Sequence, residues 1–320
     1  MKKNLTNTGI AAAIVLIAFA VAFINRAKAC DDCKVMAETT IFTNSEEAAL
    51  PQTVIEKIVS DFLNSPLEET KERKKVLILG YDGFREDGLS NISDARNSAV
   101  LSIMDSGGLY HSYAGGTGEN LQATSTSPGW TSMLTGGWFD YHGIHENGIE
   151  KNDVPTLFET AAQQGYSTVF ISSWRDHFDI TYKKDIEEAK LRNELSQYIP
   201  AENDEDSKNQ AIKAIQQNTD IIMAIAEYTD IAGHSTGYGN DNPLYQEACQ
   251  NADQWGKEIL NAVMARETYQ NEEWLIIITT DHGGIENSHG SQSKEERKTW
   301  FTINQSIAID EEMLNYSKKN

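Results

Sequence analysis

Cysteine is scarce in this chain, with 3 among 320 residues. Cys30 and Cys33 form a Cys-x-x-Cys pair, but no second pair follows that would complete a four-cysteine zinc site. A small-loop disulfide, or no special role, is therefore favoured over redox catalysis for this pair. Cys249 lies within a helical pattern and is expected to be a small buried apolar residue.

Positive charge is also scarce. Lys and Arg number 27 against 48 Asp and Glu, and the formal net charge is −21. Residues 1–29 hold four of the basic residues and no acidic one, so the rest of the chain carries 23 − 48 = −25. Binding of nucleic-acid polymers requires Lys and Arg to neutralise successive phosphates, so such polymers are excluded as partners. The acidic surface is otherwise expected to serve solubility.

A hydrophobic run long enough to cross a bilayer is missing. The apolar run from Ile10 to Ile24 is shorter than the roughly 20 residues that a span requires. Lys2 and Lys3 precede it, and small residues at Ala27-Lys28-Ala29 follow it, which is typical of a signal peptide over residues 1–29. An uncleaved N-terminal anchor is the alternative. In either case we expect the protein to act outside the cytoplasm and to meet the membrane only through this segment.

The rest of the chain predicts one catalytic α/β domain. Residues 30–74 are polar, acidic in patches and weakly amphipathic, with breaks at Pro51 and Pro66, and are interpreted as a stalk, linker or short helical segment before a domain over residues 75–320. From residue 76 onward the pattern alternates between strands and helices, which predicts a three-layer sandwich with a mostly parallel central sheet. The expected strands include 76–82, 109–113, 167–172 and 274–280, and the expected helices are 91–104, 128–135, 154–164, 206–217 and 244–267.

Three of the apolar runs end in acidic residues. Asp82 follows the first run, Asp230 follows the run that starts at residue 221, and Asp281 with His282 follows the run from 274. An Asp at one strand end is usually a turn former, and a lone His is usually structural. However, open α/β sheets bind ligands outside the carboxyl ends of their strands, so three such ends are expected to converge on one crevice.

The side chains at these ends suit metal ions. They comprise three carboxylates and three imidazoles, because His234 follows Asp230 by four residues and His289 follows the last run. This mixture of oxygen and nitrogen ligands suits Zn²⁺, whereas Mg²⁺ prefers oxygen alone. Two divalent cations would bring +4 against −3 from the three aspartates, so a site with a net charge of about +1 would attract an anion.

A hydroxyl and a carboxamide lie in the segment between the first and second runs. Thr126 precedes Pro128, which suits the first turn of a helix, so Thr126 is expected where free backbone N–H groups can bind an anion. A threonine needs a base or a metal ion to act as a nucleophile near neutral pH. Asn147 follows in a turn, and a phosphoryl group could lie between the two side chains.

Together these residues resemble the alkaline phosphatase superfamily, and within it the type I phosphodiesterase/nucleotide pyrophosphatase branch, over Lys75 to Ser306. The resemblance implies an alkaline phosphatase-like fold and two metal ions. It assigns to one ion Asp230, His234 and His289, and to the other Asp82, Asp281 and His282, with Thr126 as the nucleophile bound beside them. The branch also places an Asn 21 residues after the nucleophile, and 147 − 126 = 21 gives Asn147 as the ligand of a phosphoryl oxygen.

The chain departs from that branch in two places. Its members usually carry a long insertion between the Asp-His pair and the final His, whereas here 289 − 282 = 7. Pro-Gly-Trp also replaces the Phe-Pro-Asn that many members carry after the nucleophile. The substrate specificity of longer members is therefore not transferred.

The expected function is hydrolysis of small phosphoesters, either phosphodiesters or nucleotide pyrophosphates, through a phosphothreonine. Phosphomonoesterase or phosphonate hydrolase activity is an alternative, and Arg175 is the candidate to bind the additional substrate charge. A sulfatase is disfavoured, because Thr126-Ser-Pro-Gly-Trp130 lacks the Cys or Ser and the Arg of that motif. From another class, a non-catalytic surface binding protein that keeps the fold is the remaining alternative.

Overall fold

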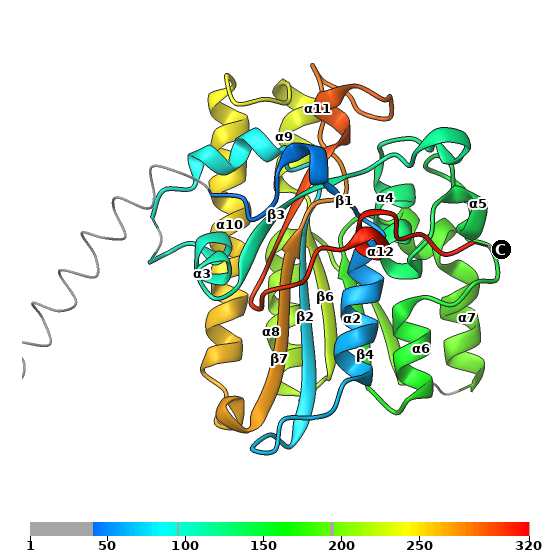
Figure 1. Cartoon of the computed structure of the whole chain (residues 1–320), viewed down its shortest axis with the longest axis vertical. Coiled ribbons are helices and arrows are strands. Elements are labelled where there is room, and N and C mark those ends of the chain that lie inside the picture. Colours follow the sequence, from blue (N-terminus) through cyan, green and yellow to red (C-terminus); the bar gives the residue numbers. More distant parts are fainter. Residues whose placement is uncertain (1–40, 95, 193–194, 320) are drawn as a thin grey trace, which may run out of the picture.

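The computed structural model describes residues 41–94, 96–192 and 195–319 (Figure 1). The predicted signal or anchor segment at residues 1–29 and the Cys30/Cys33 pair lie outside the described residues. Within the described ranges, no helix combines the length and apolar character needed to cross a membrane.

The strands of the described residues form one eight-stranded sheet in the order β1-β3-β8-β7-β2-β6-β4-β5. β2 pairs in parallel with both β7 and β6, while β8 runs antiparallel to its neighbours β3 and β7. The prediction of a mostly parallel sheet is confirmed. The strands are β1 (Leu50–Pro51), β2 (Arg73–Tyr81), β3 (Gly108–Tyr113), β4 (Thr168–Ser172), β5 (Ser196–Pro200), β6 (Ile221–Ala226), β7 (Glu272–Thr279) and β8 (Lys298–Ile303).

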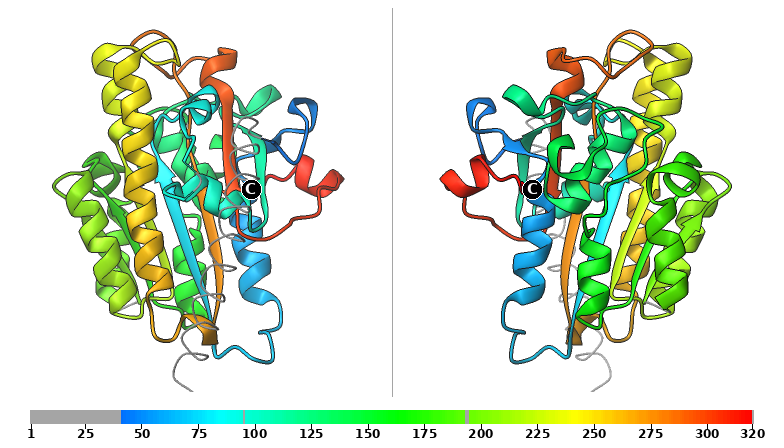
Figure 2. Two further views of the ribbon diagram at one scale, coloured as in Figure 1. Left: turned by 90° about the vertical axis from the view of Figure 1, so that its left-hand side faces the viewer. Right: turned by 90° about the vertical axis from the view of Figure 1, so that its right-hand side faces the viewer.

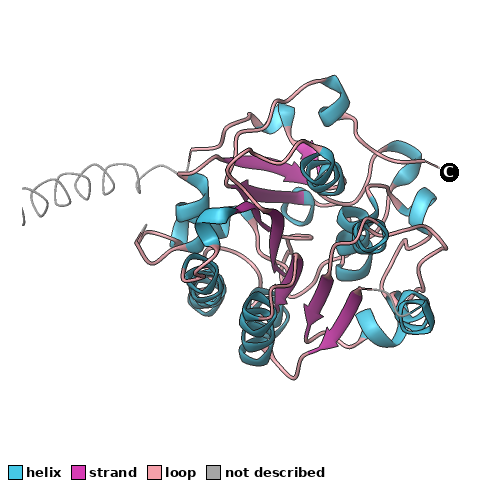
Figure 3. Ribbon diagram, turned by 90° about the horizontal axis from the view of Figure 1, so that it is seen from below, coloured by secondary structure: helices cyan, strands magenta, loops and turns pink. Residues whose placement is uncertain are grey.

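Helices cover both faces of this sheet, as Figures 2 and 3 show. The α-helices are α2 (Val54–Asn64), α3 (Ala99–Met104), α4 (Thr126–Thr135), α5 (Phe139–His142), α6 (Leu157–Gln163), α7 (Lys183–Arg192), α8 (Asp204–Gln216), α9 (Tyr228–Thr236), α10 (Pro243–Met264), α11 (Lys294–Arg297) and α12 (Glu311–Leu314). Short 3-10 helices span η1 (Glu46–Ala48), η2 (Glu86–Asn91), η3 (Gly118–Asn120) and η5 (Tyr269–Asn271), and a π-helix spans η4 (His177–Thr181).

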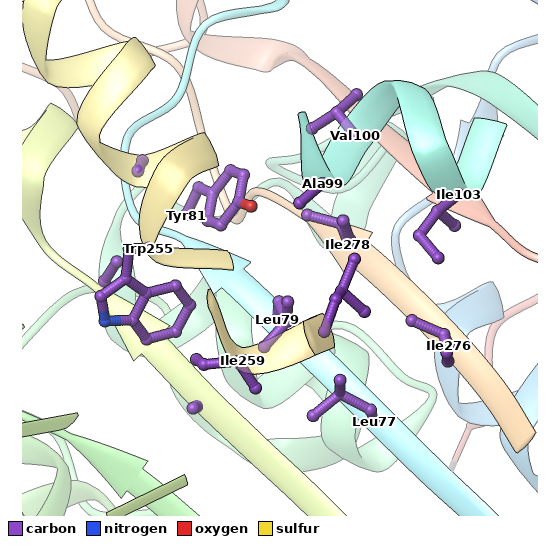
Figure 4. Close-up of a cluster of buried hydrophobic side chains, with 14 of the residues drawn as sticks. Leu77, Leu79, Tyr81, Ala99, Val100, Ile103, Trp255, Ile259, Ile276 and Ile278 are labelled. Atoms are coloured by element: carbon purple, nitrogen blue, oxygen red, sulfur yellow. The ribbon is translucent and has the colours of Figure 1, made fainter. Parts of the chain in front are cut away.

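The hydrophobic core has two halves because successive side chains of a strand point to opposite faces. Leu77 and Leu79 of β2 pack with α3, α8 and α10, where Trp255 and Ile259 lie over the sheet (Figure 4). Val76 of β2 points to the other face and packs with α2, α4 and α6. Each large apolar side chain buried here stabilises the fold by about 1.5–3 kcal/mol, which fixes the strands that carry the site.

The segment interpreted as a linker is, from residue 41, part of the folded body. Val54, Ile58 and Phe62 line one side of α2 and are buried against the sheet, and β1 pairs with β3. The spacing of these residues is that of an amphipathic helix, whose polar face gives the segment its linker-like composition. The structure thus differs from the predicted boundary at residue 75.

Most other expected elements agree with the structure within a few residues, but two differ in length. The predicted helix over 91–104 is α-helical only from Ala99, and residues 86–91 form the 3-10 helix η2. The helix predicted from Pro128 begins at Thr126, so Thr126 is the first helical residue of α4.

Candidate active site

The acidic strand ends meet at one edge of the sheet. β7, β2 and β6 are adjacent, and their carboxyl ends lead directly to Asp281, Asp82 and the α9 helix that carries Asp230. α9 and α11 lie at the top of the molecule in Figure 1, above this edge. The structure therefore brings together residues that are far apart in the sequence, as the topology of parallel sheets predicts.

One candidate ligand group consists of Asp82, Asp281 and His282, all fully buried. His282 Nε2 lies 3.5 Å from Asp82 Oδ1 and 3.4 Å from Asp281 Oδ2. His282 Nδ1 lies 2.8 Å from the Gly283 carbonyl oxygen, to which only an N–H can donate, so Nε2 carries the lone pair. Three atoms of the group have no hydrogen-bond partner: Asp82 Oδ1, Asp281 Oδ2 and His282 Nε2.

The second candidate group consists of Asp230, His234 and His289. His234 Nε2 lies 3.4 Å from Asp230 Oδ2, and His289 Nε2 lies 3.6 Å from Asp230 Oδ1. The spacing of four residues between Asp230 and His234 places both side chains on one face of α9. His289 arrives from the loop after β7.

The imidazoles of the second group are held in the same tautomer as His282. His234 Nδ1 donates to the Asn287 carbonyl oxygen at 3.0 Å, and His289 Nδ1 donates to the Thr124 carbonyl oxygen at 3.1 Å. Their Nε2 atoms are 3.0 Å apart, and both lie near the Asp230 carboxylate. Backbone carbonyl partners at Nδ1 are typical of metal-binding histidines, whose Nε2 then binds the ion.

The pKa values of Asp82, Asp281 and His282 are shifted because these side chains are buried without a counter-charge. Burial, and next the charge of Asp281, raises the pKa of Asp82 well above its usual value. Burial also raises the pKa of Asp281 and lowers the pKa of His282. Because a buried cation would stabilise the ionised carboxylates, the residues of both groups fit divalent metal ions, and their nitrogen and oxygen atoms suit zinc.

Thr126 is the first residue of α4, and residues on both sides of it in the sequence contact the two groups. On one side of it in the sequence, the Thr124 carbonyl contacts His289. On the other side, Trp130 Nε1–H donates to Asp82 Oδ2 at 3.1 Å, and Gly129 packs so closely on Asp281 that an added Cβ would lie 2.8 Å from its Cβ. Thr126 itself is 4% exposed, and the side chain of the N-cap residue Ser125 makes no capping hydrogen bond.

Asn147 is attached to the same turn. Its Oδ1 accepts the backbone N–H of Ser127 at 2.9 Å, so the amide NH₂ is the end that remains to donate. Arg175, by contrast, is exposed, and its guanidinium lies 3.5 Å from Asp179 of the π-helix. The candidate role of Arg175 in substrate binding thus stays a prediction.

Sequence reasoning missed two donors to the ligand carboxylates. Trp130 is completely buried, as expected for a core residue, but its indole N–H also bonds Asp82. Tyr238 lies in the Gly-rich loop after α9 and donates its hydroxyl to Asp230 Oδ1. A buried Trp or Tyr usually finds a hydrogen-bond partner, but the identity of that partner is not encoded locally.

The position after Asp82 requires a glycine because Asp230 of the second group packs against it. Gly83 has a φ of +64°, and an added Cβ would lie 2.9 Å from Asp230 Oδ1. Only glycine adopts this left-handed conformation without strain, so the turn at residue 83 lets the two ligand groups approach each other.

Comparisons with known proteins agree with this geometry. Residues 76–314 match the profile of the family described as type I phosphodiesterase/nucleotide pyrophosphatase. No curated protein matches the sequence significantly.

Several solved structures are similar to this chain at low sequence identity. A 2-O GAG sulfatase superposes with a TM-score of 0.54 and 13% identity, covering 73% of this chain and 64% of the sulfatase. Murine ectonucleotide pyrophosphatase/phosphodiesterase 5 gives 0.49 and 19%, covering 66% and 57% of the two chains. A protein of the alkaline phosphatase superfamily from Vibrio parahaemolyticus gives 0.48 and 13%, covering 81% and 70%.

The chain therefore spans less than two thirds of the length of the first two of these proteins. The sulfatase likeness shows the alkaline phosphatase-like fold and not a shared substrate. The family match covers most of the chain. The chain belongs to the type I phosphodiesterase/nucleotide pyrophosphatase family.

Proposed function

We propose that the chain hydrolyses small phosphodiesters, or the pyrophosphate bond of nucleotides, through a covalent phosphothreonine at Thr126. The observation that supports the proposal is that residues flanking Thr126 contact both candidate ligand groups, since the Thr124 carbonyl bonds His289 and the Trp130 indole bonds Asp82. A hydroxyl in this position can approach phosphorus while the substrate's charge faces both groups.

We propose that two divalent cations, with Zn²⁺ best suited, bind at the two ligand groups. Asp230, His234 and His289 would hold one, and Asp82, Asp281 and His282 would hold the other, beside Thr126. When bound, such cations supply positive charge that favours the alkoxide form of an alcohol and stabilises negative charge on a phosphoryl group.

The residues of the chain then perform two displacements. Thr126 gives its hydroxyl proton to solvent and its Oγ attacks phosphorus, while the bond from phosphorus to the leaving oxygen breaks and the leaving alcohol or nucleotide departs after taking up a proton from solvent. A water molecule then attacks the phosphothreonine, the bond from phosphorus to Oγ breaks, and Thr126 is restored. The Thr126 N–H and the Asn147 NH₂ donate to a nonbridging oxygen in both steps, because Ser127 holds the Asn147 amide with its oxygen turned away.

The charge of the site supports a diester over a monoester. A monoester carries an additional negative charge, which related monoesterases meet with an arginine. Here Arg85 bonds Asp87 and the Gly284 carbonyl oxygen, while Arg175 faces Asp179 on the surface. Neither arginine contacts a ligand group, so a substrate with one negative charge on the phosphoryl group fits better.

We also propose that the enzyme works outside the cytoplasm, on small substrates. The export proposal rests on the sequence of residues 1–29, and the substrate size rests on the net charge of −21.

Two assays test the proposal. The wild type should hydrolyse bis-p-nitrophenyl phosphate faster than p-nitrophenyl phosphate. Thr126→Ala should lower turnover on the order of a thousandfold or more while zinc remains bound. Thr135→Ala is the matched control, because Thr135 lies in the same helix and its hydroxyl bonds only the Thr131 carbonyl oxygen. Full activity of Thr126→Ala would refute the nucleophile.

Metal analysis of the purified protein separates the enzyme from a binding module. The proposal expects about two zinc ions per chain, with turnover lost when a chelator removes them. A folded protein that binds no metal would instead favour the non-catalytic alternative.

A further inference from the structure

Tyr238 is a buried tyrosine that touches both ligand-bearing segments. Its hydroxyl donates to Asp230 Oδ1, and its backbone N–H donates to the Glu286 carbonyl oxygen at 2.6 Å. Its ring lies 5.7 Å from the ring of His234 and 6.3 Å from that of His289, measured between centroids, in edge-to-face arrangements. The residue is 7% exposed.

Two glycines shape the space that the ring occupies. A Cβ added at Gly233 would lie 2.3 Å from the Tyr238 ring, and a Cβ added at Gly284 would lie 2.4 Å from it. Gly233 immediately precedes His234, and Gly284 follows the Asp281-His282 pair. The ring therefore lies between α9 and the segment after β7, which together carry five of the six candidate ligands. A larger residue at either glycine would displace the ring.

The hydroxyl restricts the carboxylate that it contacts. Asp230 Oδ2 lies 3.4 Å from His234 Nε2, whereas Oδ1 accepts the Tyr238 hydroxyl, lies 3.6 Å from His289 Nε2 and faces the Gly83 turn. A hydrogen bond to one carboxylate oxygen fixes the rotation of the carboxylate and leaves the other oxygen free to bind a metal ion.

We propose that Tyr238 is a positioning residue that orients Asp230, and thereby sets the metal affinity of the group formed by Asp230, His234 and His289. The proposal rests on the proposed function, because it requires that this group binds a metal ion. It adds a residue that acts through Asp230 and touches neither substrate nor the reacting atoms.

The direct test is zinc binding by Tyr238→Phe, which keeps the ring and removes the hydroxyl. Zinc is titrated into chelator-stripped protein in competition with a chromophoric chelator, so that two dissociation constants are resolved. One of them should weaken by about 10- to 100-fold, as expected for loss of a hydrogen bond to a ligand, and the other should stay unchanged. Unchanged zinc constants would overturn the proposal.

Tyr316→Phe is the matched control. Tyr316 also donates its hydroxyl to a carboxylate, Glu56 Oε2 at 2.7 Å, but this pair ties the C-terminal segment to α2. The control should lose a bond of the same type and keep both zinc constants. Thermal unfolding of the stripped proteins should show that both variants fold, and excess zinc should restore the activity of Tyr238→Phe, which a folding defect would not allow.

A double-variant cycle with Asp230→Asn identifies the route of the effect. If Tyr238 acts through Asp230, the added Tyr238→Phe change should have little further effect on zinc binding in the Asp230→Asn protein. Additive losses would overturn the proposal. If the wild type binds no zinc, both this inference and the metal part of the proposed function are refuted. If Thr126→Ala is fully active, only the nucleophile assignment is refuted, and the zinc dissociation constants of Tyr238→Phe still test this inference.

Discussion

Glu227 is a buried acid beside the ligand groups, and its replacement gives a stability change that can be worked out from the structure. The residue precedes α9 and is 6% exposed, and its Oε1 accepts the Ser172 hydroxyl at 3.3 Å. Burial, and next the charges of Asp230 and Asp204, raises the pKa of Glu227 from 4.5 to about 8. The folded state therefore favours the protonated form of this carboxyl.

The direction of the pH dependence follows from this shift. Below pH 4.5 the carboxyl is protonated in both the folded and the unfolded state, so it does not affect stability. Between pH 4.5 and about 8 the unfolded state ionises first, and the folded state loses about 1.4 kcal/mol per pH unit relative to it. At pH 7 the difference is 7 − 4.5 = 2.5 units, so Glu227 destabilises the metal-free protein by about 3 kcal/mol.

Glu227→Gln should remove this penalty, because an amide keeps the shape and still accepts from Ser172. Guanidinium unfolding of chelated protein should show the variant to be more stable by about 3 kcal/mol at pH 7, with little difference near pH 4.5. The exposed Glu267→Gln serves as the control and should change stability by less than about 0.5 kcal/mol at either pH. Zinc at the neighbouring groups would stabilise the ionised form, so saturating zinc should reduce the gain. A gain that is the same at both pH values would refute the reasoning.

Two further variants test the packing around the site. Gly129→Ala should cost about 1–3 kcal/mol of stability and reduce turnover, because the new Cβ would lie 2.9 Å from the Asp281 carbonyl oxygen; unfolding and turnover assays check this, and a neutral variant would contradict the contact. Lys151→Met removes the partner of the buried Asp185, 3.0 Å away, and should cost about 3–5 kcal/mol where Asp185 is ionised. Because burial raises the pKa of Asp185 to about 7, unfolding experiments should find this cost above pH 7 and a smaller one at pH 5.

The sequence predicted the sheet well because its evidence is local. The apolar runs that become β2, β6 and β7 have no polar interruption, as expected for strands buried on both faces. Parallel strands must end at the same edge, so the acidic residue after each run could be placed without knowing any distance. For residues 30–74 the sequence left a stalk and a short helical segment open, and the packing of α2 on the sheet shows that residues 54–64 belong to the folded body.

The contacts around the site could not be predicted in this way. Trp130 and Tyr238 read as core and loop residues, and their bonds to Asp82 and Asp230 depend on the approach of α4 and of the loop after α9. The same holds for Glu227, whose pKa is raised first by burial and then by the charges of Asp230 and Asp204.

By itself, the sequence determined which side chains are available as ligands and at which strand ends they occur, because hydrophobic periodicity and motif spacing are properties of neighbouring residues. The tertiary structure alone decided the distances within each ligand group, that Asp82 Oδ1, Asp281 Oδ2 and His282 Nε2 lack hydrogen-bond partners, and that a tyrosine hydroxyl bonds Asp230. The physical reason is that these distances depend on how helices pack on the sheet, and that packing is set by contacts between residues far apart in the chain.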